Sequence, residues 1–513
     1  MSDEPDEVSR RSFLEQAAIG GVGIAAGAVV SGATPASAAV EQVASKETWL
    51  SERASCVSGN RLLGPGGDAP APVRTKARAI YRPGSAEEVA EVIRSLPAGT
   101  PVACVCGGHE SSNAATVASA DAIALDMAKL KSIEFHADGE RKLVTVGAGV
   151  VFRELVEAVK ARHGALPVGT GPGVGVVGYV VNGGLSGYFS RRLGLLGQRV
   201  VKLTMVTAAG EIRVLAPGDE LFTAMLGAGA ALGVVVDLTL ALADESVVRG
   251  GEQRVIGFET RDQAVAFARE ALRIQRDRVL PDESVSMELV VTGTKVLVAT
   301  YVFYDGFEGS TAAFVEPLET LAARESLPVV AAAHWDSWYE TAAALWPVIE
   351  GMKGTPLAML QHCVGTVEAP GDAILDFLCD TVIAEAPLDE ATMSIVEIRT
   401  LGGAILSHAE LPTGNCRHRF FCDMVAMYDA KGTSLETRRG IGDRIARIMA
   451  KARGVEGLAV DFSGTHSQPD DPGAFVSPPV IFGSAETAES LVALKRRVDP
   501  ENRFRFHPFA KFL

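Results

Sequence analysis

The spacing of apolar and polar positions predicts a helix followed by a buried strand near the start of the ordered pattern. Ser85-Ala-Glu-Glu88 has the form of a capping box, and the apolar residues after it recur at helical spacing until Pro97. Residues 101–106 are then continuously apolar, which is typical of a short strand buried on both faces. That strand ends abruptly at Gly107-Gly108.

The same reading predicts mixed elements along the rest of the chain. We expect strands at 122–126, 142–146, 200–207, 212–215, 233–240, 393–400 and 419–428, a hairpin of 284–291 with 296–304, and helices at 152–162, 219–226, 308–324, 371–385 and 485–498. The alternation after about residue 245 suits a sheet with one open face. The predicted fold class is α+β.

Composition narrows the function classes. The chain has 513 residues with 48 Lys+Arg against 63 Asp+Glu, a net charge of −15, which argues against a nucleic-acid partner. A hydrophobic content of 47% is ordinary for a globular protein, and the length suggests two large domains. The seven cysteines do not form a disulfide pattern, and Cys104-Val-Cys106 lacks a companion pair, so we expect no metal site.

The first 38 residues have the features of an export signal. Ser9-Arg10-Arg11-Ser12-Phe13-Leu14 has the twin-arginine form, 17–30 is apolar and small, and Ala36-Ser37-Ala38 fits a cleavage site. The alternative, a membrane anchor, is disfavoured because the apolar run is short and rich in Gly and Ala. The sequence therefore predicts export through the twin-arginine machinery, without stable membrane insertion after cleavage. Because this route carries folded proteins, it also favours a cofactor loaded before export.

Glycines are concentrated between 168 and 194, where we expect little regular structure. Gly173-Val-Gly175-Val-Val-Gly178 matches a dinucleotide fingerprint, but no strand precedes it directly, no helix is expected to open on it, and no acid follows at the required distance. The Rossmann interpretation is therefore disfavoured. Such a run can still form a nest of backbone N–H groups for a diphosphate.

Gly107-Gly108-His109 follows the buried strand directly. Paired glycines let backbone amides approach an anion, and an imidazole just beyond them would lie over the group that carries the anion. A structural role for this histidine is the alternative when the motif is taken alone.

Several segments, in order, resemble the FAD-binding domain of the vanillyl-alcohol oxidase and p-cresol methylhydroxylase superfamily, especially its berberine bridge enzyme-like branch. They lie within 75–245 and 485–507. The segments are Arg82-Pro-Gly-Ser85, Val105-Cys-Gly-Gly-His109, Val174-Gly-Val-Val-Gly178 with Gly183-Gly184 and Ser190-Arg-Arg-Leu-Gly-Leu195, Asp219-Glu-Leu-Phe222 with Gly227 and Gly233-Val-Val235, and Val498-Asp-Pro-Glu-Asn-Arg-Phe504.

The resemblance implies a bipartite FAD-binding domain of two α/β subdomains and a substrate domain whose antiparallel sheet is covered by helices. The implied boundaries are 39–245 and 476–513 for the FAD-binding domain and 246–475 for the substrate domain. His109 matches the histidine that is bonded covalently to the flavin in many members. The implied FAD contacts are Val105, Cys106, Gly107, Gly108, His109, Glu110, Ser111, Gly171, Val174, Gly175, Gly178, Tyr179, Gly183, Gly184, Val235 and Asn502.

Three positions depart from the family pattern. Gly171 stands where bicovalent members carry a second flavin-bound Cys, so at most one covalent bond is expected. Val105 replaces the usual Arg of the first loop, so backbone amides or another residue must meet the phosphate charge. Ile481-Phe482-Gly483-Ser484 stands in place of the Tyr-x-Asn motif before the last helix, which removes a frequent catalytic tyrosine.

The resemblance places the catalytic base on the sheet of the substrate domain. Oxidation of a carbon next to O or N needs a base that takes the hydroxyl or amine proton. The candidates are Glu397 and Arg399, which alternate onto one face of a strand, Tyr428 on the following strand, and Tyr304 at a strand end. Each could instead be a salt-bridged or packed side chain.

Together these features predict an exported flavoprotein oxidase, with FAD attached through His109, a small-molecule substrate and O2 as acceptor. Two alternatives stay open: a dehydrogenase or natural-product tailoring enzyme that does not use O2, and a flavin-free binding protein. The sequence does not name the substrate.

Overall fold

A computed structural model describes most of the chain after residue 76. The described residues are 40–44, 77–108, 120–248, 250–293, 297–304, 309, 311–351, 357–388, 394–429, 433–463 and 477–506. The predicted export signal lies outside them. Within the described residues, no helix is both long enough and apolar enough to cross a bilayer.

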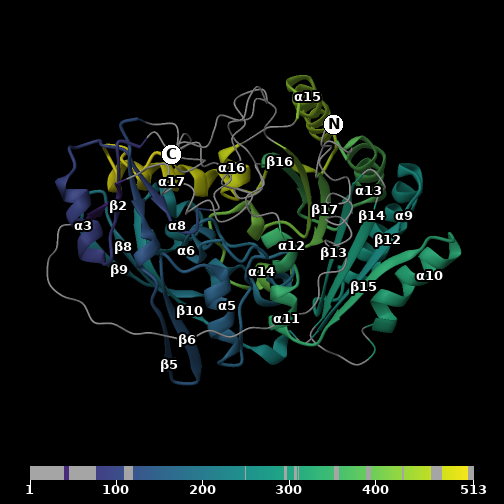
Figure 1. Cartoon of the computed structure of the whole chain (residues 1–513), viewed down its shortest axis with the longest axis horizontal. Helices are drawn as coiled ribbons and strands as arrows, with labels where there is room; N and C mark the ends of the chain where they lie inside the picture. Colours follow the sequence, from purple (N-terminus) through teal and green to yellow (C-terminus); the bar gives the residue numbers. More distant parts are fainter. Residues whose placement is uncertain are drawn as a thin grey trace, which may run out of the picture.

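A small, mostly parallel sheet forms the first unit (Figure 1). Its strand order is β1-β2-β4-β3, in which β2, β4 and β3 are parallel. The strands are β1 (Glu41–Gln42), β2 (Ala79–Arg82), β3 (Val102–Val105) and β4 (Ile123–Asp126), and α3 (Ala86–Ser95) lies between β2 and β3. The Ser85 side chain caps α3 by accepting a hydrogen bond from Glu88 N at 3.1 Å, as the capping box predicts.

An antiparallel sheet of order β5-β6-β10-β8-β9 forms the second unit. Its strands are β5 (Ile133–Asp138), β6 (Arg141–Gly147), β8 (Val200–Val206), β9 (Ile212–Leu215) and β10 (Val234–Ala241). With it lie α5 (Phe152–Lys160), α8 (Glu220–Ala228) and the small strand pair β7 (Gly164–Ala165) and β11 (Ala243–Asp244). The glycine-rich stretch contains two short helices, α6 (Val176–Val180) and α7 (Ser190–Leu193). The expectation of almost no regular structure there was wrong, because the apolar residues around Gly178 form a buried helical turn that tolerates this glycine, and α7 contains no glycine.

An eight-stranded antiparallel sheet of order β15-β12-β14-β13-β17-β18-β16-β19 dominates the other half of the molecule. Its strands are β12 (Gly250–Gly257), β13 (Val285–Thr292), β14 (Leu297–Tyr304), β15 (Val329–Trp335), β16 (Leu357–Thr366), β17 (Ile395–Thr400), β18 (Phe420–Asp429) and β19 (Ala459–Val460). The accompanying helices are α9 (Arg261–Ile274), α10 (Glu316–Arg324), α11 (Trp338–Ala343), α12 (Trp346–Gly351), α13 (Asp372–Phe377), α14 (Ala404–Ser407) and α15 (Leu435–Ala452).

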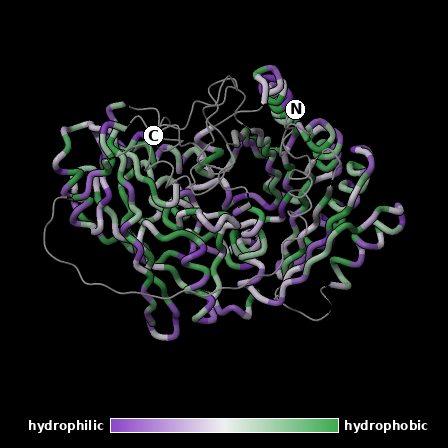
Figure 2. The backbone as a smooth tube through the Cα atoms, viewed as in Figure 1, coloured by the Kyte–Doolittle hydropathy of each residue, from purple (hydrophilic) through white to green (hydrophobic). Residues whose placement is uncertain are grey.

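Two apolar cores meet this large sheet from its two sides. One core contains residues of α9, α10, α13 and α15 together with alternate residues of the strands. The other joins the remaining alternate residues, among them Tyr301, Phe303 and Phe421, to the first two units. In Figure 2 green, hydrophobic segments follow the strands, and purple is common at loop tips. Hence each strand of the large sheet presents one face to helices and one to the glycine-rich half.

The end of the chain returns to the first unit. Figure 1 shows α17 (Ala485–Val498) beside α8, with α16 (Pro478–Ile481) next to it. Lys495 Nζ donates to Ala231 O at 2.6 Å, and Val102 N donates to Arg503 O at 3.0 Å. These long-range bonds fix the C-terminal segment against the parallel sheet, although the exact domain boundaries at 245 and 475 stay predictions.

Candidate active site

Two glycine-containing turns, distant in the chain, touch each other. The first follows β3 at Cys106-Gly107-Gly108, and the second contains Gly173 and Gly175. A Cβ atom added at Gly107 would lie 2.3 Å from Gly175 N and 2.6 Å from Gly173 O. One added at Gly175 would lie 2.4 Å from Gly107 N. Only glycine at both positions allows this backbone approach.

Hydrogen bonds to α5 hold the second turn in place. Phe152 N donates to Val174 O and Arg153 N to Pro172 O, both at 3.0 Å, and Val174 N donates to Gly171 O at 3.2 Å. A five-residue helix, α6, begins inside the motif at Val176, which the sequence analysis did not expect. No strand directly precedes the motif, in agreement with the rejection of a Rossmann site.

Tyr179, on α6, closes the second turn from one side. Its ring packs edge-on against Phe152 at 4.9 Å between centroids, and its hydroxyl is buried without a hydrogen-bond partner among the described residues. Gly184 lies against the same ring, and Gly183 lies against Thr413 of the segment that follows α14. The turn is therefore packed between α5 and the large sheet's connecting segments.

Charged side chains of the large sheet meet the glycine-rich half at Gly187. A Cβ atom added at Gly187 would lie 2.7 Å from Glu288 Oε2 and 2.8 Å from Arg399 Nε. Arg399 pairs with Glu397, on the same strand, and its Nε lies 3.4 Å from Glu288 Oε2 on β13. The predicted residues Glu397 and Arg399 are thus brought together on the side that faces the glycine turns.

This cluster is buried and electrostatically coupled. The Glu288 side chain is 2% exposed, and those of Arg399 and Glu397 are 11% and 14% exposed. Burial, and then the charge of Glu397, hold the pKa of Glu288 well above its usual value. Burial alone would lower the pKa of Arg399, but Glu397 and Glu288 raise it, so the guanidinium stays charged.

Tyrosines from both halves face the cluster. The Tyr188 ring packs at a tilt against Phe303, at 4.3 Å between centroids, and its hydroxyl is buried without a partner in the described structure. Burial and the nearby Glu288 raise the pKa of both Tyr188 and Tyr301, so both phenols are neutral. Sequence reasoning missed Glu288, Tyr188 and Tyr301. A glutamate in the middle of an apolar strand was the available signal for Glu288.

Tyr304 and Tyr428 lie on the opposite side of the sheet, so the structure does not bring them together with Glu397 and Arg399. Both belong to the core shared with the helices, and Tyr428 is 1% exposed there beneath Arg438 of α15. The reason is the alternation of side chains along a strand. Asp423 on β18 is the Cα partner of Glu397 on β17, so both lie on the same side of the sheet. Tyr428 is five residues after Asp423, an odd number, and therefore lies on the opposite side.

The remaining predicted FAD contacts have varied surroundings. Val105 packs in a small core with Ile80 and Ala124, so it could contact a ligand only through its backbone. Val235 is buried on β10, and Asn502 is exposed in the turn after α17 with φ +49°. Their roles in FAD binding stay predictions. His109, Glu110 and Ser111 lie outside the described residues.

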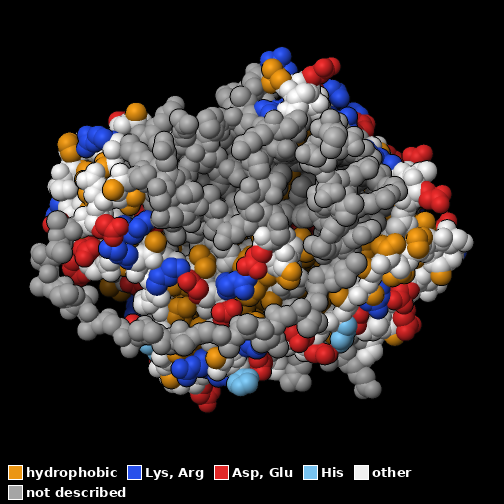
Figure 3. Space-filling model, viewed as in Figure 1, with side chains coloured by type: hydrophobic (Ala, Val, Ile, Leu, Met, Phe, Trp, Pro, Cys, Tyr) orange, Lys and Arg blue, Asp and Glu red, His pale blue; other side chains and the backbone are white. Residues whose placement is uncertain are grey.

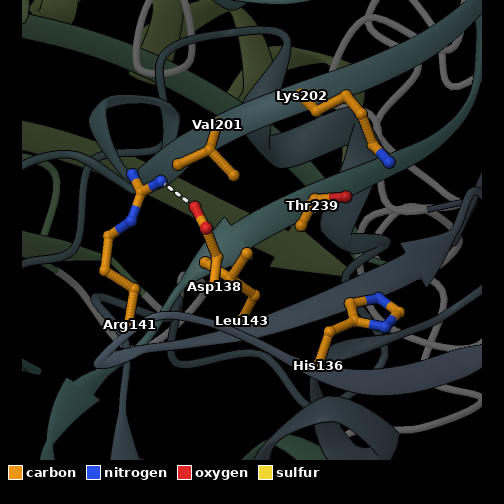
Figure 4. Close-up of a pocket in the computed structure, with 7 residues that line it drawn as sticks. All are labelled: His136, Asp138, Arg141, Leu143, Val201, Lys202 and Thr239. Atoms are coloured by element: carbon orange, nitrogen blue, oxygen red, sulfur yellow. Dashed lines mark hydrogen bonds and ion pairs between the residues drawn. The ribbon is translucent and has the colours of Figure 1, made fainter.

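A shallow pocket of about 360 Å³ lies elsewhere, on the open face of the second sheet (Figure 4). Asp138 and Arg141, which both line it, form an ion pair. The His136 ring is hydrogen-bonded to the Thr145 hydroxyl, which is also hydrogen-bonded to the Thr239 hydroxyl. Its lining includes no residue of the glycine turns. No cluster of His, Cys, Asp or Glu suited to a metal occurs among the described residues.

The surface shown in Figure 3 carries no continuous basic area among its described side chains, because Lys and Arg are interspersed with Asp and Glu there. The described side chains of that face therefore form no basic surface of the kind that binds nucleic acid.

The contacting turns fit an FAD diphosphate. Backbone N–H groups of closely apposed glycine turns can form anion-binding concavities, and a side chain at either position would collide with the backbone of the facing turn. The buried hydroxyls of Tyr179 and Tyr188 leave two hydrogen-bonding groups for a polar ring between the halves.

Comparison with known proteins supports this assignment. Residues 77–216 match the FAD binding domain family. The (R)-6-hydroxynicotine oxidase of Paenarthrobacter nicotinovorans is 32% identical over 161 residues, which cover 31% of this chain and 34% of that protein. The chain thus matches only about a third of the length of such curated relatives.

The structural similarity covers much more of the chain than the sequence similarity does. Berberine bridge enzyme from Eschscholzia californica superposes with a TM-score of 0.69 at 16% identity, covering 91% of this chain and 94% of that one. A xylooligosaccharide oxidase from Myceliophthora thermophila gives 0.68 at 17% identity, with 91% and 95% covered. The chain therefore carries an FAD binding domain over residues 77–216, and its overall fold is that of berberine bridge enzyme and the xylooligosaccharide oxidase.

Proposed function

We propose that the chain is an FAD-dependent oxidase that oxidises a carbon bearing O or N in a small organic molecule. The observations that carry the proposal are the contact of the two glycine turns with each other and the contact of the Glu288, Glu397 and Arg399 cluster with the same glycine-rich half at Gly187. FAD, when bound, would supply the acceptor for the hydride of the substrate carbon, which carries the two electrons of the oxidation. The relatives include proteins named as a hydroxynicotine oxidase and an alditol oxidase, which supports a substrate of this general kind.

In this proposal Glu397 is the base. Its carboxylate takes the proton of the substrate hydroxyl or amine as the C–H bond breaks, and the C=O or C=N bond forms. Arg399 stabilises the carboxylate before the transfer and orients it toward the glycine-rich half. O2 then takes up the two electrons and two protons as hydrogen peroxide.

The cofactor part of the proposal is tested by the colour of the purified protein. We expect visible flavin absorbance that stays with the protein on acid precipitation, because His109 is proposed to be bonded to the flavin. In His109→Ala the colour should be released by acid. Colourless wild-type protein would favour the flavin-free binding protein, and colour released from the wild type would remove only the covalent bond.

The acceptor is tested separately, by mixing anaerobically reduced enzyme with air. Rapid reoxidation supports an oxidase. Slow reoxidation would favour the dehydrogenase or tailoring enzyme that uses another acceptor.

The proposed export rests on the twin-arginine pattern at the N-terminus. A fusion of residues 1–38 to a folded reporter should leave the cytoplasm. Replacing Arg10 and Arg11 together by Lys should retain the reporter inside, and export of that variant would refute the twin-arginine route.

A further inference from the structure

Residues of five neighbouring strands form a continuous row on the side of the large sheet that faces the glycine turns. Successive Cα partners are Gln253 with Tyr301, Tyr301 with Glu288, Glu288 with Arg399, and Arg399 with Phe421. The next row places Glu397 opposite Asp423, and Asp423 opposite Cys363. Three carboxyl groups therefore surround one guanidinium within two rows.

The charges in these rows do not balance if every carboxyl is ionised. Arg399 offers one positive charge against Glu288, Glu397 and Asp423, and Glu288 and Asp423 are each 2% exposed. Gln361 Nε2 donates to Asp423 Oδ2 at 2.8 Å, which supplies a neutral partner to that carboxylate. Tyr188 and Tyr301 face Glu288 as neutral phenols, and Tyr179 lies near Arg399. Two buried carboxylates in contact cannot both stay ionised at little cost.

The carboxyl groups of Glu288 and Glu397 both lie against the guanidinium of Arg399, and the neighbouring Glu397 raises the pKa of Glu288. Two buried carboxyl groups at one guanidinium are most stable when one of them keeps its proton and can donate it to the other, since an ionised carboxylate only accepts hydrogen bonds. Glu288 is the more buried, and its carboxyl lies 3.4 Å from Arg399 Nε, whereas Glu397 pairs closely with Arg399 Nη2. The guanidinium therefore favours the charge on Glu397 and leaves the proton on Glu288.

We propose that Glu288 is a positioning residue that keeps its proton and donates it to Glu397, and so holds Glu397 as an ionised acceptor facing the glycine turns. This inference rests on the proposed function, in which Glu397 is the base. It predicts that the two carboxyl groups titrate as a pair, with one proton lost at low pH and the other at high pH.

The direct test is the infrared absorbance of protonated carboxyl groups in the purified protein, recorded as a function of pH. Wild type should show a carboxylic acid band that persists above neutral pH, and Glu288→Gln should lose it. The matched control is Glu252→Gln, which changes another buried carboxyl, on the helix-facing side of the same sheet, where Arg254 and His334 pair with it. This control should keep the band, and a band that persists unchanged in Glu288→Gln would overturn the inference.

A second readout separates this inference from the proposed function. The rate of anaerobic flavin reduction by substrate should fall at high pH in wild type and in Glu252→Gln, because the shared proton is lost. The alkaline fall should disappear in Glu288→Gln, since its amide donates at every pH. If the flavin of Glu397→Gln is reduced as fast as that of wild type, the assignment of Glu397 as the base is wrong. The loss of the infrared band in Glu288→Gln would still establish that Glu288 carries the proton of the carboxyl pair. An alkaline fall retained in Glu288→Gln would instead refute the positioning role and leave the base intact.

Discussion

The two sides of the eight-stranded sheet are built from the same strands but have opposite chemistry. On the side that faces the helices, Val396, Ile398 and Tyr428 belong to an apolar core. On the other side, Glu397 and Arg399 of the same strand β17 join Glu288. Because side chains alternate along a strand, a shift of one residue decides whether a group lies in a core or beside the glycine turns. Residue type alone therefore does not identify a catalytic candidate on this sheet.

The largest expected effect concerns the base. Glu397→Gln should slow anaerobic flavin reduction by about 10²- to 10⁴-fold, because the amide cannot take the substrate proton. Tyr428→Phe, on the opposite side of the neighbouring strand, should leave the rate unchanged. Stopped-flow absorbance compares the two variants. Equal slowing in both variants would contradict the claim that only the Glu397 side of the sheet takes part in catalysis.

The next effect concerns the arginines of the two sides. Arg399→Met leaves buried carboxyls without their cation and should lower the free energy of unfolding by about 3–5 kcal/mol. Arg269→Met, on the helix side, removes pairs with Asp376 and Asp380, whose side chains are 54% and 62% exposed, and should cost about 0–1 kcal/mol. Denaturant unfolding measures both losses. A larger loss for Arg269→Met would contradict the account of the buried cluster.

A smaller effect is expected at Gly187, where the glycine-rich half meets the cluster. Gly187→Ala places a methyl against Glu288 and Arg399 and should cost about 1–3 kcal/mol. Gly371→Ala, before α13 on the helix side, meets nothing within 4 Å and should change stability by less than about 0.5 kcal/mol. If both variants unfold at the same denaturant concentration, the close contact at Gly187 is not present in solution.

The smallest effect is the pH dependence of stability. The pKa of Glu288 is raised on folding, so the folded state holds its proton more tightly than the unfolded chain. Its contribution is therefore complete below the unfolded pKa and is lost as pH rises through the folded pKa, by about 1.4 kcal/mol for each unit of the shift.

Thermal unfolding over a pH series checks this dependence. Glu288→Gln should flatten the decline of stability toward high pH, and Glu252→Gln should not. A wild-type protein whose stability rises over that range would show that Glu288 ionises on folding.

The sequence predicted local elements better than their pairing. The helix expected at 485–498 is α17 with the same bounds, and the hairpin expected at 284–291 and 296–304 is β13 and β14 within one residue at each end. Capping residues and alternation are local signals, so they can be read from a single chain.

The candidate site depended on contacts that no local signal contains. Glu288 meets Arg399 only through the pairing of β13 with β17, which are far apart in the sequence. The side of the large sheet on which Tyr304 and Tyr428 lie could not be predicted for the same reason, because it depends on a strand register that the sequence of one strand does not reveal. Gly107 and Gly175 were recognised as backbone approach points, but their mutual contact came from the fold.

The central claim is that these two glycine turns together hold FAD, and the flavin content of Gly107→Ala tests it most directly. A methyl at Gly107 would collide with Gly175 N, whereas one at Gly84, in the turn before α3, would meet no atom closer than 3.8 Å. Wild type and Gly84→Ala should be purified with stoichiometric FAD, and folded Gly107→Ala should carry little. Full flavin content in Gly107→Ala, or none in the wild type, would contradict the account.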